Sequence, residues 1–370
     1  MKKLTIFLSL LLCASLLAGC AGTPVVYYTN CTCPTGSHDE ALQTPTEPAP
    51  TEIAPTEIAP TPAEGALKTG LAIVTGISDS KSADGEEAGE GKYDVTMVAV
   101  LVDDNGVIQD CIIDGIAASV KFDASGALVT DTAAAPQTKN ELGENYGMVA
   151  WGGAIAEWDA QAAALADFVV GKHFGELRGV AVSESGYAPE GSDLASSATI
   201  YLGGYVSAIE QAAANAQHLG AQAGDMLKLA TVTGIDSSAA ASEEKAGNAQ
   251  LDATVTALTM NGGTITSCVI DAVQAKVAFD TAGVITSDTS AAVATKNELG
   301  ENYGMVAWGG AIAEWDAQAA SFAAYITGKT LDEVMGIAVN EGTKPTDADL
   351  AASVTIAIGG FQALIAKAAG

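Results

Sequence analysis

The residues of this chain with the most chemical potential lie in a stretch that occurs twice. Residues 138–163 and 295–320 share the same 26 letters, TKNELGENYGMVAWGGAIAEWDAQAA, at an offset of 157 residues. Aromatic side chains beside flexible glycines and a few charges suit a planar or sugar-like ligand, because rings stack on aromatic faces and the backbone can approach closely. The candidate ligand-binding residues are Glu141, Tyr146, Trp151, Glu298, Tyr303 and Trp308.

A structural interpretation of the same residues stays open. Tyr146 and Trp151 could close the edge of a sheet while the charged residues face water, since aromatic side chains are commonly buried. Trp158 and Trp315 fall on an apolar helical stripe, which predicts that both belong to a hydrophobic core. The identity of the two copies itself indicates either a shared task or a recent recombination.

Two classes of catalysis can be considered for the duplicated stretch. Paired carboxylates, Glu141 with Glu157 and Glu298 with Glu314, could act as acid and base in glycoside hydrolysis. A mechanism based on histidine is excluded if both copies share one activity, because all three histidines (His38, His173 and His218) precede the second copy. We therefore predict neither a catalytic residue nor a metal ligand in this chain.

The composition excludes further classes of function. The 370 residues include 45 acidic and 16 basic residues, a formal charge of −29. Nucleic-acid binding requires lysine and arginine to neutralise phosphates, so it is not expected. Neither the phosphate-binding loop nor the strand-coupled dinucleotide fingerprint is present in the sequence.

The first residues have the pattern expected of a secretion signal. Two lysines precede an apolar stretch that is too short to span a membrane, and Leu17-Ala-Gly-Cys20 follows it. This pattern resembles the bacterial lipoprotein signal, in which cleavage before the cysteine leaves that residue lipidated. The resemblance predicts a signal peptide over residues 1–19, a lipid on Cys20, and anchoring at the outer face of the cytoplasmic membrane, facing the cell wall or the extracellular space.

A tether is predicted between the anchor and the folded part. Residues 44–65 read TPTEPAPTEIAPTEIAPTPAEG, a low-complexity run rich in proline, threonine and glutamate. Proline restricts the backbone and removes hydrogen-bond donors, so residues 20–66 should form a disordered, extended spacer without a core.

Two homologous repeat domains are expected after the tether, over residues 67–217 and 226–370. Each begins with a β-branched run and continues with strands joined by turns such as Asn105-Gly106 and Gly262-Gly263. Strands are expected over 94–102, 107–113, 254–259 and 264–270, with two further strands flanking each of the segments 123–126 and 280–283. The fold class is therefore α+β, with each repeat a mainly antiparallel sheet covered by two helices.

The helices follow from apolar spacing. The first half of each duplicated stretch should be irregular because of its glycines, and a helix should begin near Ala154 with Ile155, Trp158, Ala162, Leu165 and Val169 on its apolar face. The second copy places Ile312, Trp315, Ala319, Phe322 and Ile326 in the same way. Strands over 198–202 and 354–358 should then lead into alanine-rich helices from about Tyr205 and Phe361.

The six cysteines do not form a disulfide framework. Cys111 and Cys268 occupy equivalent positions in the repeats, each without a partner in its own repeat, so buried thiols are expected. Cys31 and Cys33 belong to the region near the anchor.

The end of each repeat resembles the closing segment of FMN-binding domains of extracellular electron-transfer lipoproteins. The segment is Asp193-Leu-Ala-Ser-Ser-Ala-Thr199 in the first repeat and Asp349-Leu-Ala-Ala-Ser-Val-Thr355 in the second, each followed by Gly-Gly and a helix. In that family the last hydroxyl of a Ser-Gly-Ala-Thr motif carries FMN, which implies Thr199 and Thr355 as attachment residues. The motif glycine is replaced by Ser197 and Ser353 here.

The sequence therefore predicts a lipid-anchored extracytoplasmic protein with two homologous binding modules rather than an enzyme. Duplication would raise avidity for a repeated wall, surface or small-molecule ligand. The alternative is an FMN-binding electron-transfer lipoprotein with two cofactors in series. The duplicated stretch is also similar to repeat modules in surface proteins of anaerobic Gram-positive bacteria.

Overall fold

The computed structural model describes residues 65–370. The predicted signal peptide (1–19), the lipid-attachment residue Cys20, Cys31, Cys33 and nearly all of the predicted tether lie outside the described residues. The elements below therefore belong to the part that was predicted as two repeats.

Six strands form two antiparallel sheets with the same order. The first contains β1 (Lys68–Gly76), β2 (Gly89–Val102) and β3 (Ile108–Phe122), and the second contains β4 (Met226–Gly234), β5 (Gly247–Asn261) and β6 (Thr264–Phe279). The middle strand pairs with both neighbours in each sheet. The predicted turns are confirmed: Gly106 adopts φ of 80°, and Gly262 and Gly263 adopt 57° and 88°.

The strands are longer than the sequence predicted, and the second pair of strands is incomplete. β3 and β6 continue without a break to Phe122 and Phe279, through the polar residues Asp114 and Asp271. Beyond the turns at 123–126 and 280–283 the chain forms only isolated bridges, Phe122 with Leu128 and Phe279 with Ile285. Each sheet therefore has three strands, because the residues after these turns pair at a single position.

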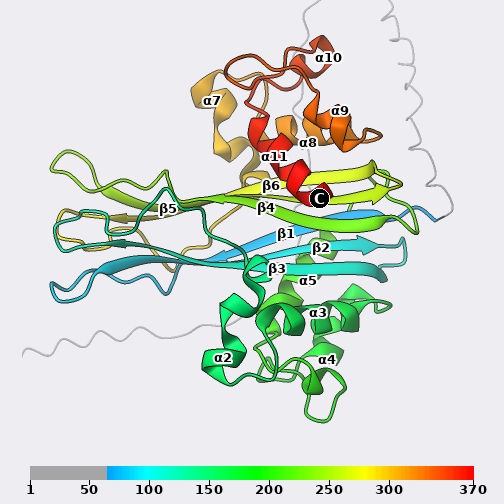
Figure 1. Cartoon of the computed structure of the whole chain (residues 1–370), viewed down its shortest axis with the longest axis horizontal. Helices are drawn as coiled ribbons and strands as arrows, with labels where there is room; N and C mark the ends of the chain where they lie inside the picture. The colour runs from blue at the N-terminus through cyan, green and yellow to red at the C-terminus, as the bar shows by residue number, and fades with distance from the viewer. Residues whose placement is uncertain (1–64) are drawn as a thin grey trace, which may run out of the picture. The chain divides into compact units, whose positions relative to one another are not determined.

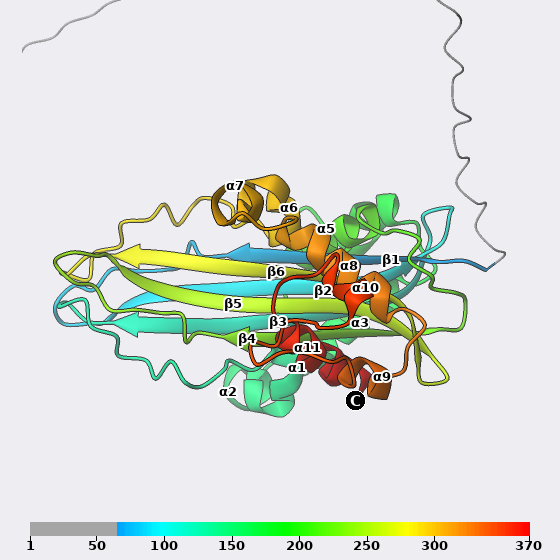
Figure 2. The ribbon, with the colours of Figure 1, turned by 90° about the horizontal axis from the view of Figure 1, so that it is seen from above.

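The two sheets pack face to face and share one central core. In β2, Val95, Met97 and Ala99 point to this core, while the alternate residues Val98 and Val100 point to the helices. The rings of Phe122 and Phe279 stack across the interface with centroids 3.8 Å apart and planes 4° from parallel. Figure 2 shows β6 along the β1 side and β4 along the β3 side. The hydroxyl groups of Thr69 in β1 and Ser267 in β6 lie 2.6 Å apart.

Helices cover the outer face of each sheet. α3 (Trp158–Val169) and α5 (Gly203–Ala214) pack on the first sheet, and α8 (Trp315–Ile326) and α11 (Gly359–Ala369) pack on the second. Figure 1 shows the resulting layers, helices, sheet, sheet, helices. The predicted α+β class with antiparallel sheets is confirmed, and each half has a helix-side core of its own beside the shared one.

Shorter helical segments complete each half. The first has α1 (Lys139–Leu142), η1 (Gly143–Tyr146), α2 (Met148–Gly152), η2 (Phe174–Glu176), α4 (Leu177–Ala181) and η3 (Leu194–Ser196). The second has α6 (Lys296–Leu299), η4 (Gly300–Tyr303), α7 (Met305–Gly309), α9 (Leu331–Met335) and α10 (Ala348–Ala351). The prediction that the first half of the duplicated stretch is irregular was therefore wrong, since its glycines separate short helical turns.

The long helices begin later than predicted. α3 begins at Trp158 because Glu157 is extended (φ −67°, ψ 164°) and turns its carboxylate back toward α2. Ile155 and Ile312 consequently lie off the apolar face and are each 57% exposed. The other predicted core positions, including Trp158 (3% exposed) and Trp315 (7%), are buried as expected.

The strands predicted before the last helix of each repeat do not form. Residues 198–202 and 354–358 make no ladder, and α5 and α11 begin at Gly203 and Gly359, two residues earlier than expected. A buried glutamine takes the place of a neighbouring strand: Gln161 Oε1 accepts hydrogen bonds from the backbone N–H groups of Thr199 and Ile200.

The shared core predicts that the two halves unfold together. Replacing Phe122 with Ala should lower the free energy of unfolding by about 3 to 5 kcal/mol, because it removes a fully buried ring and leaves a cavity. Denaturant unfolding followed by fluorescence and circular dichroism should show one transition in both proteins. Val129→Ala, at a position 58% exposed, is the control and should change little. Two separate transitions, with only one shifted by Phe122→Ala, would contradict the shared core.

Candidate functional site

The duplicated stretch begins with a capped turn in both halves. Thr138 accepts a hydrogen bond from the Glu141 N–H (3.1 Å), and the Glu141 carboxylate accepts one from the Thr138 N–H (2.9 Å). Thr295 and Glu298 repeat this capping box at 3.2 and 2.8 Å. The first carboxylate of the predicted site therefore helps to form α1 or α6.

An asparagine docks each turn on its sheet. The Asn140 backbone N–H donates to Asp114 Oδ1 (3.1 Å), and its side-chain amide donates to the Ile113 carbonyl (3.0 Å). Asn297 makes the same two bonds, each 3.0 Å, to Asp271 and the Ile270 carbonyl. Sequence reasoning missed Asn140 and Asn297, although their identity in both copies was an available signal.

Of the two aspartates that accept these bonds, Asp271 is buried and Asp114 is half-buried. Burial raises the pKa of Asp271 to about 6, although hydrogen bonds from the Thr295 side chain and the Asn297 and Ala272 N–H groups oppose the shift. Burial raises the pKa of Asp114 as well, against the corresponding hydrogen bonds. The docking bonds stabilise the charged form, and the surrounding protein destabilises it.

A lysine lies between two aromatic rings in each half. Lys139 is 6% exposed, with Nζ 4.9 Å from the Trp158 ring and 5.6 Å from the Tyr146 ring. Lys296 Nζ lies 4.8 Å from both Trp315 and Tyr303. Burial works against the charge of Lys139, but Tyr205 and Asp94 raise its pKa overall, so the ammonium is retained. Tyr146 and Tyr303, both predicted ligand-binding residues, are half-buried partners of this cation.

The predicted carboxylate pairs are engaged in structural contacts. Glu141 forms an ion pair with Lys367 of the other repeat, and Glu298 accepts a hydrogen bond from Gln211 of the other repeat at 3.0 Å. Glu157 accepts from the Met148 and Val149 N–H groups at 2.8 and 3.0 Å and so caps α2. Glu314 caps α7 in the same way at 2.7 and 2.9 Å. These contacts favour structural roles over acid and base catalysis.

The remaining predicted aromatic residues point into solvent. Trp151 and Trp308 are each 91% exposed, although they lie on α2 and α7 between glycines. Exposed aliphatic side chains adjoin them, Val149 and Ile155 in the first half and Val306 and Ile312 in the second. We call residues 149–155 and 306–312 the tryptophan turns. The alternative in which Trp151 closes a sheet edge is wrong, because its ring packs on no sheet.

Glycine is needed at the start of each tryptophan turn. Gly147 and Gly304 both adopt φ of 82°, a region that other residues rarely enter. A Cβ atom on Gly304 would also lie 2.3 Å from the Trp308 ring. Glycine thus allows the chain to reverse in both halves, and in the second half it also leaves space for the indole.

A hollow adjoins the second tryptophan turn. It has a volume of about 640 Å³ and is lined by Glu301, Asn302, Val306, Ala307, Glu314, Asp316 and Ala317. All seven residues belong to the duplicated stretch, so the first half contains the same residue types at the matching positions. Amide and carboxylate groups beside an exposed indole can bind a ligand that has both hydroxyl groups and an apolar face.

The residues implied by the FMN resemblance lie in equivalent surroundings. Thr199 is exposed and Thr355 is half-buried, and each hydroxyl donates to a buried glutamine oxygen at 3.2 Å, Gln161 in the first half and Gln318 in the second. The same oxygens accept the Thr199 and Thr355 backbone N–H groups. Gln161 and Gln318 belong to the duplicated stretch, which explains part of its identity.

Other site types are not found among the described residues. No cluster of three histidine, cysteine or acidic side chains within 65–370 has an arrangement that could hold a metal ion. Cys111 and Cys268 are free and buried, as expected, and burial raises the pKa of both thiols. In the same range, every helix is too short or too polar to cross a bilayer.

Comparisons with known proteins add no family to these observations. No protein-family model, curated protein or solved structure matches this chain.

The buried carboxylate of Asp271 predicts a pH-dependent stability. Its pKa is about 6 in the folded protein against 3.8 for the free group, so folding favours the protonated form. The stabilisation that the protonated Asp271 carboxyl provides is fully present below about pH 4 and is lost as the pH rises through 6. Through this group, the free energy of unfolding should fall by about 3 kcal/mol over this range. The difference in unfolding free energy between the wild type and Asp271→Asn, measured from pH 4 to 7.5, should therefore fall by that amount. A difference that rises or stays constant with pH would contradict this assignment.

Proposed function

We propose that this protein is a surface-attached binding protein that presents the two tryptophan turns to a repetitive ligand. The observation that carries the proposal is the 91% exposure of both Trp151 and Trp308 within a stretch of identical sequence. A fully exposed tryptophan adds nothing to the core, and an exposed apolar side chain of this size is a common feature of binding surfaces.

The identity of the turns supports binding more than folding. Much of the duplicated stretch has a structural task, such as capping, docking or the lysine sandwich described above. The exposed residues Val149, Trp151 and Ile155 have no such task, yet they are the same in the second half. A common ligand for both tryptophan turns accounts for the identity of these exposed residues in the two halves.

A neutral or cationic glycan is the ligand class that fits the surroundings best. Indole rings stack on the apolar faces of sugar rings, and the adjoining hollow offers Asn302, Glu301 and Glu314 to hydroxyl groups. The net charge of −29 repels anionic polymers. Two turns on one chain would engage two units of the same polymer and raise its avidity.

Attachment to the membrane is the second part of the proposal. The segment Leu17-Ala-Gly-Cys20 supports lipidation of Cys20 and an extracytoplasmic location, with the residues before the first strand acting as a tether. A glycan-binding module held in this way would link the cell to its own wall or to a neighbouring surface.

The binding proposal predicts a large loss when both indoles are removed. Trp151→Ala with Trp308→Ala should weaken binding to insoluble wall polysaccharide and to soluble neutral glycans at least tenfold, while each single variant should lose less, since one turn remains. Sedimentation and affinity electrophoresis measure this loss, with Val129→Ala as the control for an exposed apolar side chain. Wild-type protein that binds no glycan, or a double variant that binds equally well, would contradict the proposal.

A flavin carrier is the second candidate function. It is supported by the equivalent positions of Thr199 and Thr355. The Thr199 hydroxyl donates a hydrogen bond to Gln161, and the Thr355 hydroxyl donates one to Gln318, the matching glutamine of the second half. The resemblance to FMN-binding domains would make these hydroxyls the points of attachment.

One mass measurement tests both the anchor and the flavin. Protein extracted from membranes of a bacterial host that produces a flavin transferase should carry an acyl mass that is lost on Cys20→Ser. An added FMN mass that disappears on Thr199→Ala or Thr355→Ala would favour the flavin carrier. A colourless protein without that mass would leave the binding function, and a non-acylated wild type would contradict the anchor.

A further inference from the structure

The two halves differ at one pair of symmetric contacts between the repeats. Glu141 and Glu298 are each the third residue of their helix, α1 and α6. Glu141 meets Lys367, the ninth residue of α11, whereas Glu298 meets Gln211, the ninth residue of α5. An ammonium group therefore lies at one interface and a neutral amide at the other.

Lys367 fills the interface on its side. Besides its ion pair with Glu141, its Nζ donates to the Thr231 carbonyl at 2.7 Å, and Thr231 is the sixth residue of β4. The alkyl stem thus spans from the helix to the edge strand and ends between a carboxylate and a carbonyl. A carboxylate and a carbonyl thus accept two of the three N–H groups of this ammonium, which the chain itself supplies.

The matching place on the other side is an open groove. Ile73, the sixth residue of β1, lines it together with Leu71, Gln211, Val269, Asp271 and Glu298, and its volume is about 350 Å³. The Glu298 carboxylate holds two hydrogen bonds, from the Thr295 N–H and the Gln211 amide, and a carboxylate can accept about four. Acceptor positions therefore remain for a donor in the groove.

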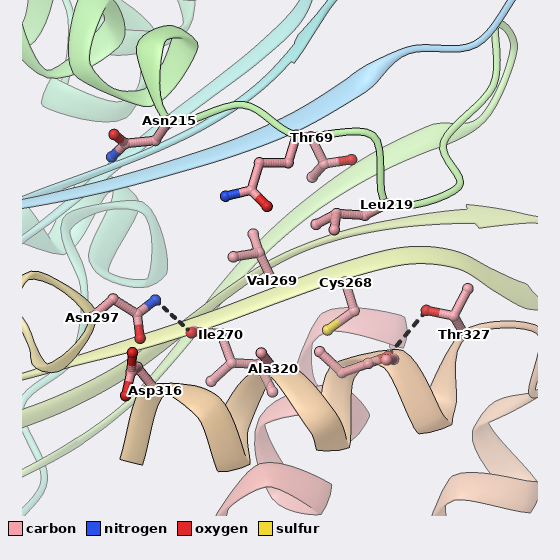
Figure 3. Close-up of a pocket in the computed structure, with 13 residues that line it drawn as sticks. Thr69, Asn215, Leu219, Cys268, Val269, Ile270, Asn297, Asp316, Ala320 and Thr327 are labelled. Carbon is pink, nitrogen blue, oxygen red and sulfur yellow. Dashed lines mark hydrogen bonds between the residues drawn. The ribbon is translucent and has the colours of Figure 1, made fainter. Parts of the chain in front are cut away.

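The groove continues into a second cavity of about 520 Å³ along β6 and α8. The two cavities share Asn215, Gln217, Val269 and Asn297. Figure 3 shows Asn215 and Thr69 on one wall, with Asn297, Ala320 and Asp316 on the other. Asp316 Oδ1 is buried, and no described residue donates a hydrogen bond to it.

The lining selects a cation. Its charged side chains are Asp271, Glu298 and Asp316, and neither cavity is lined by lysine, arginine or histidine. The walls also include the aliphatic residues Leu71, Ile73 and Val269, beside amide side chains such as Asn215 and Gln217. An anionic ligand would be repelled, whereas an alkyl chain with charged ends would place each part against a matching surface.

We propose that this groove binds a linear aliphatic diamine, with one ammonium at Glu298 in the position that Lys367 fills in the other half and the second ammonium at Asp316. The ligand repeats the chemistry of a lysine side chain, which the molecule already accommodates at the symmetric contact. The groove shares Asp316, but no other lining residue, with the hollow beside the second tryptophan turn, and the diamine proposal does not depend on the glycan proposal.

Calorimetric titration of the full chain with putrescine tests the site. One equivalent should bind, and n-butanol, which has a similar chain without charge, should not bind. n-Butylamine should bind more weakly than putrescine, because it lacks the group that meets Asp316. Absence of putrescine binding, or equal binding of butanol, would overturn the proposal.

Variants at the groove separate a built site from general attraction to an acidic protein. Glu298→Gln should weaken putrescine binding at least tenfold, and Asp316→Asn should reduce the affinity for putrescine to that for butylamine. Glu184→Gln removes an exposed carboxylate outside the groove and should leave binding unchanged. Equal losses in all three variants would show that only net charge matters and would overturn the site.

Exchanging the symmetric residues gives the sharpest test. Gln211→Lys should place an ammonium of the chain at Glu298, abolish putrescine binding and raise the melting temperature. Lys367→Gln should open the other interface, so that two equivalents of putrescine bind. Unchanged binding in Gln211→Lys, or a stoichiometry of one in a folded Lys367→Gln, would overturn the proposal.

Discussion

The contact between the two sheets is the constraint on which the structure depends. A three-stranded sheet with helices on one side has a second apolar face, and each sheet here buries that face against the other. Burial of apolar area is the main favourable term in folding, so neither sheet is expected to keep its present form alone. The stacked rings of Phe122 and Phe279 close one end of this contact, because each is the last residue of its strand.

The pairing of the sheets also determines where the functional features lie. It brings α1 of the first half beside α11 of the second, and α6 of the second half beside α5 of the first, which creates the contacts of Glu141 and Glu298. The outer helices leave α2 and α7 at the surface, where nothing covers the indoles. One symmetric arrangement thus provides two equal tryptophan turns and one unequal pair of interfaces.

Local signals in the sequence were sufficient for much of the fold. The turn at Gly106, the apolar stripe of α3 and the burial of Trp158 all depend on residues close in sequence, and the structure confirms them. The shared core was not predicted, although β2 contains the run Val-Ala-Val-Leu-Val, and a nearly continuous apolar run is typical of a strand buried on both faces.

The candidate site was predictable only in part, for the same reason. The duplicated stretch drew attention to Trp151 and Glu141, but the partner of Glu141 is Lys367, more than two hundred residues away and in a different repeat. The strand expected at Thr199 failed because Gln161, a side chain from another element, satisfies its backbone. Contacts of this kind depend on tertiary packing, which residue spacing does not encode.

The most direct test of the binding account is a proton–nitrogen spectrum of the four indole N–H groups, recorded during titration with a neutral wall glycan. Assigned through single Trp variants, the signals of Trp151 and Trp308 should shift together as ligand is added, because both turns meet solvent. Those of Trp158 and Trp315 should stay in place, since both rings are buried. Shifts confined to Trp158 and Trp315, or none at all for any wall glycan, would contradict the proposal that the exposed turns bind.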